Sequence, residues 1–167
     1  MLVLRDAMSR WLLLPFLALG CSSYGFTEPK VPPVPPFAAT PAGHAQICVL
    51  RPHIKAGAVT FPVRDNGRLV GATRGASYFC YFALPGKHRV TSEADDVQEA
   101  NVLVMPGVRY YLHQKVSNTL GWVSSPMEWV NEAEAHKMVD TCDYRVLTEV
   151  PDGTERPPVN PVAAAIP

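Results

Sequence analysis

The sequence lacks an excess of charge of either sign. Its 15 Lys and Arg residues balance 15 Asp and Glu residues, and charged residues make up 18% of the 167-residue chain. A chain without net charge has no long-range field that would attract and hold a polyanion. We therefore expect no nucleic-acid partner. The hydrophobic share of 47% is enough to fill one core, which excludes a long disordered chain.

The sequence also has little that could cross a membrane as a helix. Its N-terminal apolar run covers ten residues, 11–20, whereas a spanning helix needs about 20. Arg5 and Arg10 precede this run and polar residues follow it, which is typical of a secretion signal. Translation starts at Met1 or at Met8, and the leader from Met8 avoids the unusual Asp6.

Residues Ala18-Leu19-Gly20-Cys21 resemble a bacterial lipobox. The resemblance implies that residues 1–20 are a lipoprotein signal peptide and that Cys21 is acylated. Two or three acyl chains make an effectively permanent anchor, because one chain alone binds a membrane only marginally. Ser22 favours the outer membrane, so we expect a lipid-anchored protein of the bacterial envelope that faces the periplasm. The alternative is an ordinary signal peptide that contains a cysteine.

Proline is scarce in the middle of the chain and frequent on both sides of it. Six of the 17 prolines lie between Pro29 and Pro41, and five lie between Pro151 and Pro167. Dense proline favours an extended polyproline II chain of about 3.1 Å per residue. We therefore interpret residues 21–45 as a lipidated cysteine followed by a stiff spacer of up to roughly 70 Å. Residues 151–167 are predicted to be a disordered tail, and residues 46–150 are predicted to be the folded domain.

Apolar residues alternate with polar ones through most of this domain, which predicts short β-strands. Asn66-Gly67, Pro85-Gly86 and Pro106-Gly107 supply turns between the strands. We expect a mainly β fold, an antiparallel meander that forms a two-sheet β-sandwich. One amphipathic helix over about residues 132–142, capped by Asn131, is predicted to cover it.

The landmarks of the domain resemble a known family. They are Arg51-Pro52, Asn66-Gly67 with Gly71, and the segments 75–79, 85–88 and 106–111. In this order they resemble an uncharacterised family of bacterial envelope lipoprotein domains with PEGA-like hairpins. The resemblance implies a transthyretin-like or Ig-like β-sandwich. It assigns no catalytic residues, because the family has none established.

Cysteine is limited to four residues, and acylation of Cys21 would leave three for disulfides. At most one intramolecular bond can then form, and three pairings are possible. Cys80 shares a predicted strand face with Tyr78 and Phe82, which suggests a buried thiol. The predicted disulfide is therefore Cys48–Cys142, although the count alone leaves the pairing open.

Motifs for catalysis and cofactor binding are missing. The five histidines have no metal-ligand spacing, and there is no nucleophile elbow, phosphate loop or dinucleotide fingerprint. We expect no enzyme activity, metal or cofactor, and instead a binding or structural module with an envelope protein or the cell wall as partner. The alternative is an envelope enzyme or metal-binding protein on the same scaffold.

The candidate binding surface is the outward side of the strand after Gly107. If Val108, Tyr110 and Leu112 point inward, the intervening side chains point outward. They are Arg109, Tyr111, His113 and Lys115. A solvated face, or one covered by the helix, is the alternative.

Overall fold

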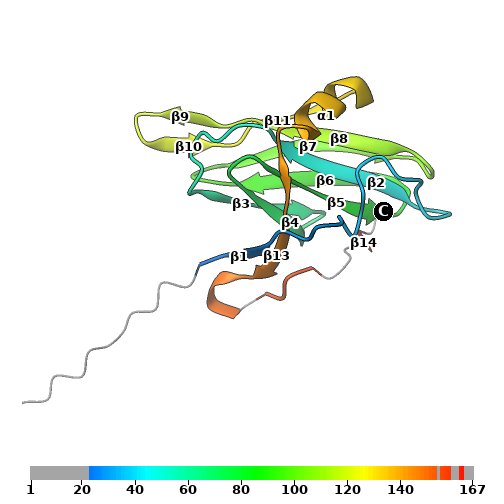
Figure 1. The fold of residues 1–167 in the computed structure, drawn as a ribbon, viewed down its shortest axis with the longest axis horizontal. Coiled ribbons are helices and arrows are strands. Elements are labelled where there is room, and N and C mark those ends of the chain that lie inside the picture. The colour runs from blue at the N-terminus through cyan, green and yellow to red at the C-terminus, as the bar shows by residue number, and fades with distance from the viewer. Residues whose placement is uncertain (1–22, 154, 159–161, 164–167) are drawn as a thin grey trace, which may run out of the picture.

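The computed structural model describes residues 23–153, 155–158 and 162–163. Over these residues the chain is mainly β, with several sheets and one α-helix (Figure 1). The predicted signal peptide and Cys21 lie outside the described residues. Their interpretation therefore stays a prediction.

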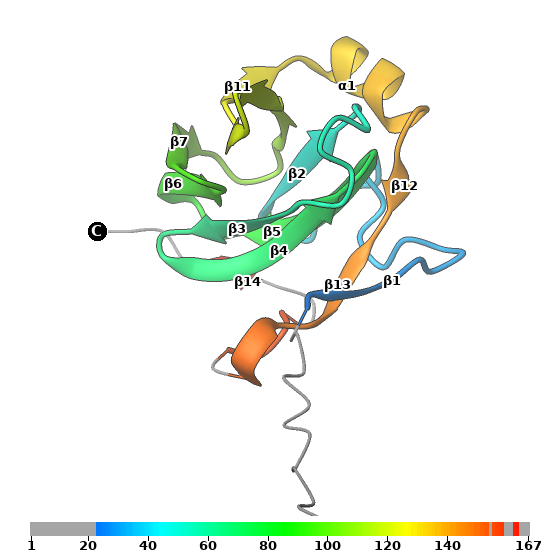
Figure 2. The ribbon, with the colours of Figure 1, turned by 90° about the vertical axis from the view of Figure 1, so that its left-hand side faces the viewer.

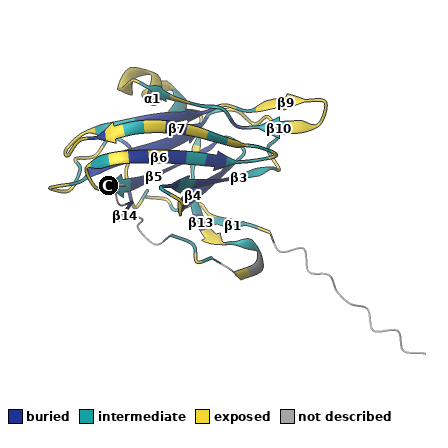
Figure 3. Cartoon of the chain, turned by 180° about the vertical axis from the view of Figure 1, so that it is seen from behind, coloured by how far each residue is buried: buried dark blue, intermediate teal, exposed yellow. Residues whose placement is uncertain are grey.

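One sheet is antiparallel and has four strands in the order β4-β3-β6-β7. Its strands are β3 (Thr60–Asp65), β4 (Arg68–Arg74), β6 (Gly86–Glu93) and β7 (Val97–Val104). The hairpin between β3 and β4 turns at Asn66 and Gly67, whose φ angles are 51° and 82°. The predicted tight turn is thus confirmed. Along β7 the side chains alternate between exposed and more buried positions, with Ala100 and Val104 buried (Figure 3).

The second large sheet has six strands, ordered β11-β8-β2-β5-β12 with β14 also on β5. They are β2 (Ala45–Arg51), β5 (Ser77–Ala83), β8 (Arg109–Gln114), β11 (Met127–Val130), β12 (Asp143–Tyr144) and β14 (Val162–Ala163). Central β2 runs antiparallel to β5 but parallel to β8. The predicted antiparallel meander is therefore wrong. The chain leaves this sheet after β5 for β6 and β7 and returns as β8 on the other side of β2, in the same direction as β2.

Two pairs of short strands complete the fold. Strand β1 (Gly25–Thr27) pairs with β13 (Val146–Glu149) (Figure 2). Strand β9 (Ser117–Thr119) pairs with β10 (Trp122–Ser124) (Figure 1). A single 3₁₀ turn, η1 (Pro151–Gly153), follows β13.

The main hydrophobic core draws on both large sheets. It includes Val49 and Phe79 of the six-stranded sheet and Val63, Val90 and Val104 of the four-stranded sheet. Both faces of the six-stranded sheet are covered, because a second cluster lies on its other side. Strand β2 is consequently buried over its whole length and shows no alternation of apolar and polar residues.

Helix α1 (Glu132–Val139) covers this second cluster with buried Ala135. Asn131 and Glu134 form the predicted capping box, so the start of the helix is confirmed. The helix ends at Val139, before the predicted Cys142. After the C-cap Asp140 the backbone turns and places Asp143 beside Ser77 of β5.

The proline-rich segment is packed against the domain, so its interpretation as an extended spacer is wrong. Val34 is buried in the second cluster. Gln46 Nε2 donates to the Pro35 carbonyl (2.7 Å), and Tyr111 Oη donates to the Pro36 carbonyl (3.2 Å). Prolines cannot donate to a strand ladder, but their carbonyls accept side-chain hydrogen bonds and their rings cover apolar surface. Segment 28–44 is therefore part of the fold.

The C-terminal segment is also ordered where it is described, so the prediction of a disordered tail is wrong for these residues. Ala163 is buried, and β14 pairs with β5 in parallel. Glu155 accepts two hydrogen bonds from Arg64, at 2.6 and 2.8 Å.

The disulfide joins Cys48 to Cys80, and Cys142 is a free thiol. The predicted Cys48–Cys142 bond is therefore wrong. Cys48 and Cys80 are register partners on antiparallel β2 and β5, and their Cα atoms lie 4.1 Å apart. Cys80 does share its sheet face with aromatic residues, as predicted, but Cys48 lies on that face directly opposite it.

Candidate functional site

The four residues of the predicted binding surface on β8 do not form one surface. Other parts of the chain cover the first two, Arg109 and Tyr111, and the other two lie at the far end of the strand. Arg109 donates to the Phe37 carbonyl (2.7 Å) and forms an ion pair with Glu132 (2.9 Å). Tyr111 is buried, and the ring of Phe37 contacts both the ring of Tyr111 and that of His136 in α1. These two residues hold the proline-rich segment and the helix against the sheet. The expectation of an outward-facing row is thus wrong for them, and the alternative of a face covered by the helix is correct.

His113 and Lys115 remain together at the far end of the strand, beside an open hollow of about 430 Å³ that His113 lines. We call this hollow, between α1, β11 and the loop after β2, the His113 hollow. Its lining comprises Pro52, His53, His113, Glu128, Val130, Glu134, Lys137, Met138 and Thr141. Val130 and Met138 belong to the second apolar cluster, so the polar rim surrounds an apolar floor.

Glu128 links the two predicted residues. Its carboxylate lies 2.7 Å from Lys115 Nζ and 3.3 Å from His113 Nδ1. The hydrogen bond from Lys115 lowers the pKa of Glu128 below its ordinary value. Burial lowers the pKa of His113, and Glu128 opposes that shift. His113 Nε2 is buried and has no hydrogen-bond partner in the described chain. One imidazole nitrogen is thus buried without a hydrogen-bond partner among the described residues.

The remaining polar residues of the hollow come from elements that the sequence separates widely. His53 follows β2, and its ring centre lies 6.2 Å from that of His113. Glu134 and Lys137 belong to α1. None of the three was predicted as a site residue. The helix that carries Glu134 and Lys137 was expected to lie on the domain. The position of His53 could not be expected, because only the pairing of β2 with β8 brings it next to His113.

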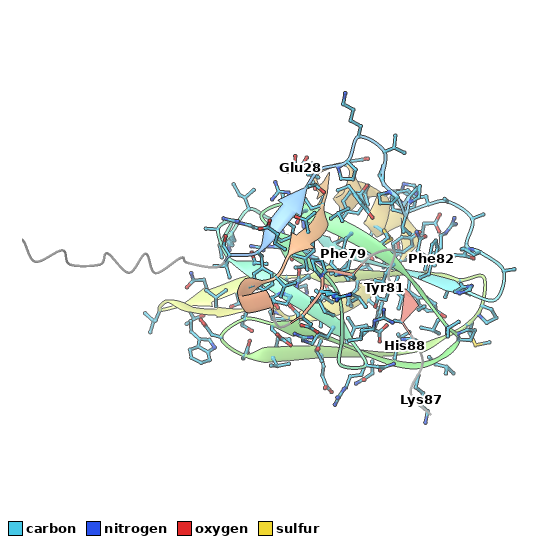
Figure 4. The ribbon with its side chains drawn as sticks, turned by 90° about the horizontal axis from the view of Figure 1, so that it is seen from below. Glu28, Phe79, Tyr81, Phe82, Lys87 and His88 are labelled. Atoms are coloured by element: carbon cyan, nitrogen blue, oxygen red, sulfur yellow. A yellow bond between two sulfur atoms is a disulfide. The ribbon has the colours of Figure 1, made fainter. Side chains whose placement is uncertain are left out.

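A second pair of titratable groups is enclosed in the core. His88 Nδ1 lies 2.7 Å from Asp65 Oδ2, and its Nε2 lies 2.8 Å from the Leu84 carbonyl. Tyr81 Oη donates to the same Asp65 oxygen. Burial raises the pKa of Asp65, and His88 opposes that shift. Figure 4 shows Tyr81 and His88 inside the molecule, while Lys87 points outward. Both His88 nitrogens are already hydrogen-bonded, so this cluster stabilises the fold and leaves no nitrogen for a substrate.

Arg51 is fully buried and holds the loop between β2 and β3. Its guanidinium donates to the carbonyls of Lys55 (2.8 Å), Ala56 (2.9 Å) and Val59 (3.0 Å) and lies over the ring of Phe61. Burial lowers its pKa to about 10. The loop that carries His53 into the hollow is therefore fixed from inside the protein.

Within the part of the chain that the structure describes, no three His, Cys, Asp or Glu side chains are grouped as a metal site. Among these residues there is also no helix with the length and hydrophobicity needed to cross a bilayer. Comparisons of the chain with family models, with curated proteins and with solved structures gave no match.

Proposed function

We propose that this chain is a lipid-anchored protein of the bacterial envelope that acts by binding rather than by catalysis. Cys21 would carry the acyl chains, and the domain would face the periplasm from the outer membrane. The observation that carries the proposal is the lipobox-like Ala18-Leu19-Gly20-Cys21, directly after an apolar run too short to span a membrane. Strand β1 starts four residues after Cys21, so an anchor there would hold the domain close to the membrane.

We further propose that the two larger sheets form a transthyretin-like or Ig-like β-sandwich, as the resemblance to PEGA-like envelope lipoprotein domains implies. The apolar cluster to which both sheets contribute supports this architecture.

The binding site in this proposal is the His113 hollow, and the partner is a short peptide segment of an envelope protein. An apolar floor at Val130 and Met138 suits an apolar side chain. The rim carries negative charge at Glu128 and Glu134 and positive charge at Lys137. A peptide has both hydrogen-bond donors and hydrogen-bond acceptors, so such a rim suits a peptide better than it suits a ligand with a single charge.

The alternative is an envelope enzyme, and one observation favours it. Glu128 lies beside His113 Nδ1 while Nε2 is unbonded, which is the arrangement of a histidine general base oriented by a carboxylate. The hydroxyl of Thr141 lines the same hollow, although it donates to the Met138 carbonyl (2.9 Å). A binding module needs the shape of the hollow, whereas an enzyme needs the His113 nitrogen.

The location is tested by mass spectrometry of the mature N-terminus. We expect an acylated Cys21, loss of acylation in Cys21→Ala, and accumulation of the precursor in the presence of globomycin. A mature chain that starts elsewhere without acyl groups would refute the anchor.

The binding site is tested by a photo-crosslinking residue at Lys137 in whole cells, with the same residue at exposed Glu99 on β7 as the control. Crosslinks to one protein from Lys137 alone support the proposal. Loss of these crosslinks in Met138→Asp but not in His113→Gln favours binding over catalysis.

A further inference from the structure

One end of the molecule presents apolar side chains to solvent. Strands β2 and β8 run in parallel, with Leu50 beside His113, so the segments that follow them leave the sheet at the same end. These segments are the loop 52–59 and the β9–β10 hairpin. Their most exposed apolar residues are Ile54 in the loop and Leu120 and Trp122 in the hairpin.

The turn at the tip of the hairpin contains a leucine in a backbone conformation that leucine rarely adopts. Leu120 and Gly121 connect β9 to β10, with φ angles of 53° and 88°. Asn, Asp or Gly is preferred at such positions, and a bulky residue there is strained. Leu120 is nevertheless fully exposed and gains no burial in return. An apolar side chain kept in a strained, solvated position points to a role outside the fold.

The base of the hairpin is fixed to the rest of the protein. Val123 N donates to Asp95 Oδ2 (2.6 Å), and Ser124 Oγ donates to Asp96 Oδ2 (3.0 Å). Behind them a buried polar chain runs from Ser125 to Ser92 and on to Gln114. The loop with Ile54 is held in the same way by Arg51. Both apolar projections are therefore presented by rigid supports.

The described chain begins at this end. Figures 1 and 3 show the first described residues, before β1, at the same end of the long axis as the β9–β10 hairpin. Cys21 precedes Ser23 by two residues. Two residues span at most about 7 Å, so an anchor at Cys21 cannot reach far from this end.

We propose that this end rests on the lipid surface and that Leu120, Trp122 and Ile54 enter its interfacial layer. This inference rests on the proposed acylation of Cys21. Tryptophan favours the membrane interface, because its ring is apolar and its N–H is polar. Residues 117–124 contain no charged residue, so no charge has to leave water when the tip enters. The contact of the hairpin then depends on apolar burial and not on anionic lipid, while Lys55 follows Ile54 in the neighbouring loop.

The test uses the full-length acylated protein in phosphatidylcholine vesicles with and without brominated lipid, which quenches tryptophan fluorescence at contact. Trp122 and Trp129 follow Cys21 in the chain, and Trp129 Nε1 donates to the Asn101 carbonyl (3.0 Å). We expect at least twofold quenching in Trp129→Phe, a smaller fractional quenching in the parent protein, where Trp129 also emits, and almost none in Trp122→Phe. The result should be the same at high salt.

Two matched variants separate insertion from misfolding. Leu120→Asn places a residue that tolerates positive φ at the turn, so the hairpin keeps its shape while the tip loses its apolar side chain. We expect it to reduce quenching of Trp122 at least twofold. Met105→Asn, the control, changes an apolar residue that is about half exposed and follows β7, away from this hairpin, and should leave quenching unchanged.

The outcomes distinguish this inference from the proposed function. Acylated Cys21 without quenching of Trp122 would overturn the membrane contact and leave the anchor intact. Absence of acylation would overturn both. Protection of Trp122 only after addition of envelope proteins would show that the hairpin binds a protein, which would also overturn the inference.

Discussion

Cysteine pairing is decided by the register of two strands. Cys48 and Cys80 face each other across β2 and β5, whereas Cys142 lies after α1 and is partly buried against the second apolar cluster. Burial raises the pKa of Cys142 to about 11, which keeps the thiolate scarce at neutral pH. The free cysteine is therefore expected to be unreactive in the folded protein.

We predict that Cys80→Ala lowers the free energy of unfolding and Cys142→Ala leaves the disulfide in place. The bond closes a loop with a sequence separation of 32, worth about 3–4 kcal/mol in the chain-entropy model. Peptide mapping without reduction and chemical denaturation measure both effects. A Cys48–Cys142 bond in the parent protein would contradict the structure.

Protonation of His113 is predicted to destabilise the fold. Its pKa is lowered from 6.5 by burial, so the unfolded chain binds the proton more tightly than the folded chain does. Stability should fall as the pH drops below 6.5 and through the folded pKa. NMR titration should show a midpoint below 6.5, and Glu128→Gln should lower it further, because Glu128 raises that pKa. A midpoint above 6.5 would be inconsistent with the buried ring.

At the scale of elements, segment 28–44 acts as a cover for the second face of the six-stranded sheet. Val34 lies in the apolar cluster, while Val31 is 76% exposed. The two valines belong to the same proline-rich segment, but Val34 packs against the sheet and Val31 faces solvent.

Val34→Asp is therefore expected to lower the free energy of unfolding by more than about 2 kcal/mol, because it buries a carboxylate without a partner. Val31→Asp, the matched control, should change it by less than about 0.5 kcal/mol. Chemical denaturation of both variants is the measurement. Equal, small effects would restore the interpretation of this segment as a free spacer.

At the scale of the whole molecule, both ends of the described chain are attached to the domain. Strand β1 pairs with β13, and Glu155 is bonded to Arg64, which also pairs with Glu93. The hydrogen bond from Arg64 lowers the pKa of Glu155 below 4.5. This contact is present above pH 4.5 and is lost as the pH falls through the folded value.

We predict that Glu155→Gln makes the segment after η1 more sensitive to limited proteolysis at neutral pH. The same sensitivity should appear in the parent protein at pH values below the pKa of Glu155, and salt should increase it, since the pair is partly exposed. Glu99→Gln on β7 serves as the charge control. Resistance of the Glu155 variant equal to that of the parent would show that β14 alone holds the segment.

Features that depend on neighbouring residues could be predicted from the sequence. The turn at Asn66-Gly67 follows from residues that tolerate positive φ, and the start of α1 follows from its capping box. The mainly β class follows from alternation along strands such as β7, because a strand with one covered face repeats every two residues. Each of these signals lies within a few positions of the chain.

Only the tertiary structure decided which distant residues meet. The disulfide depends on the register of β2 with β5, and the His113 hollow depends on the parallel pairing of β2 with β8. Composition suggested that the spacer within residues 21–45 stays extended. The second face of the six-stranded sheet, however, gives apolar side chains of this segment, such as Val34, a place to be buried. Burial stabilises a contact regardless of sequence separation, and local patterns contain no information about which surface is left to be covered.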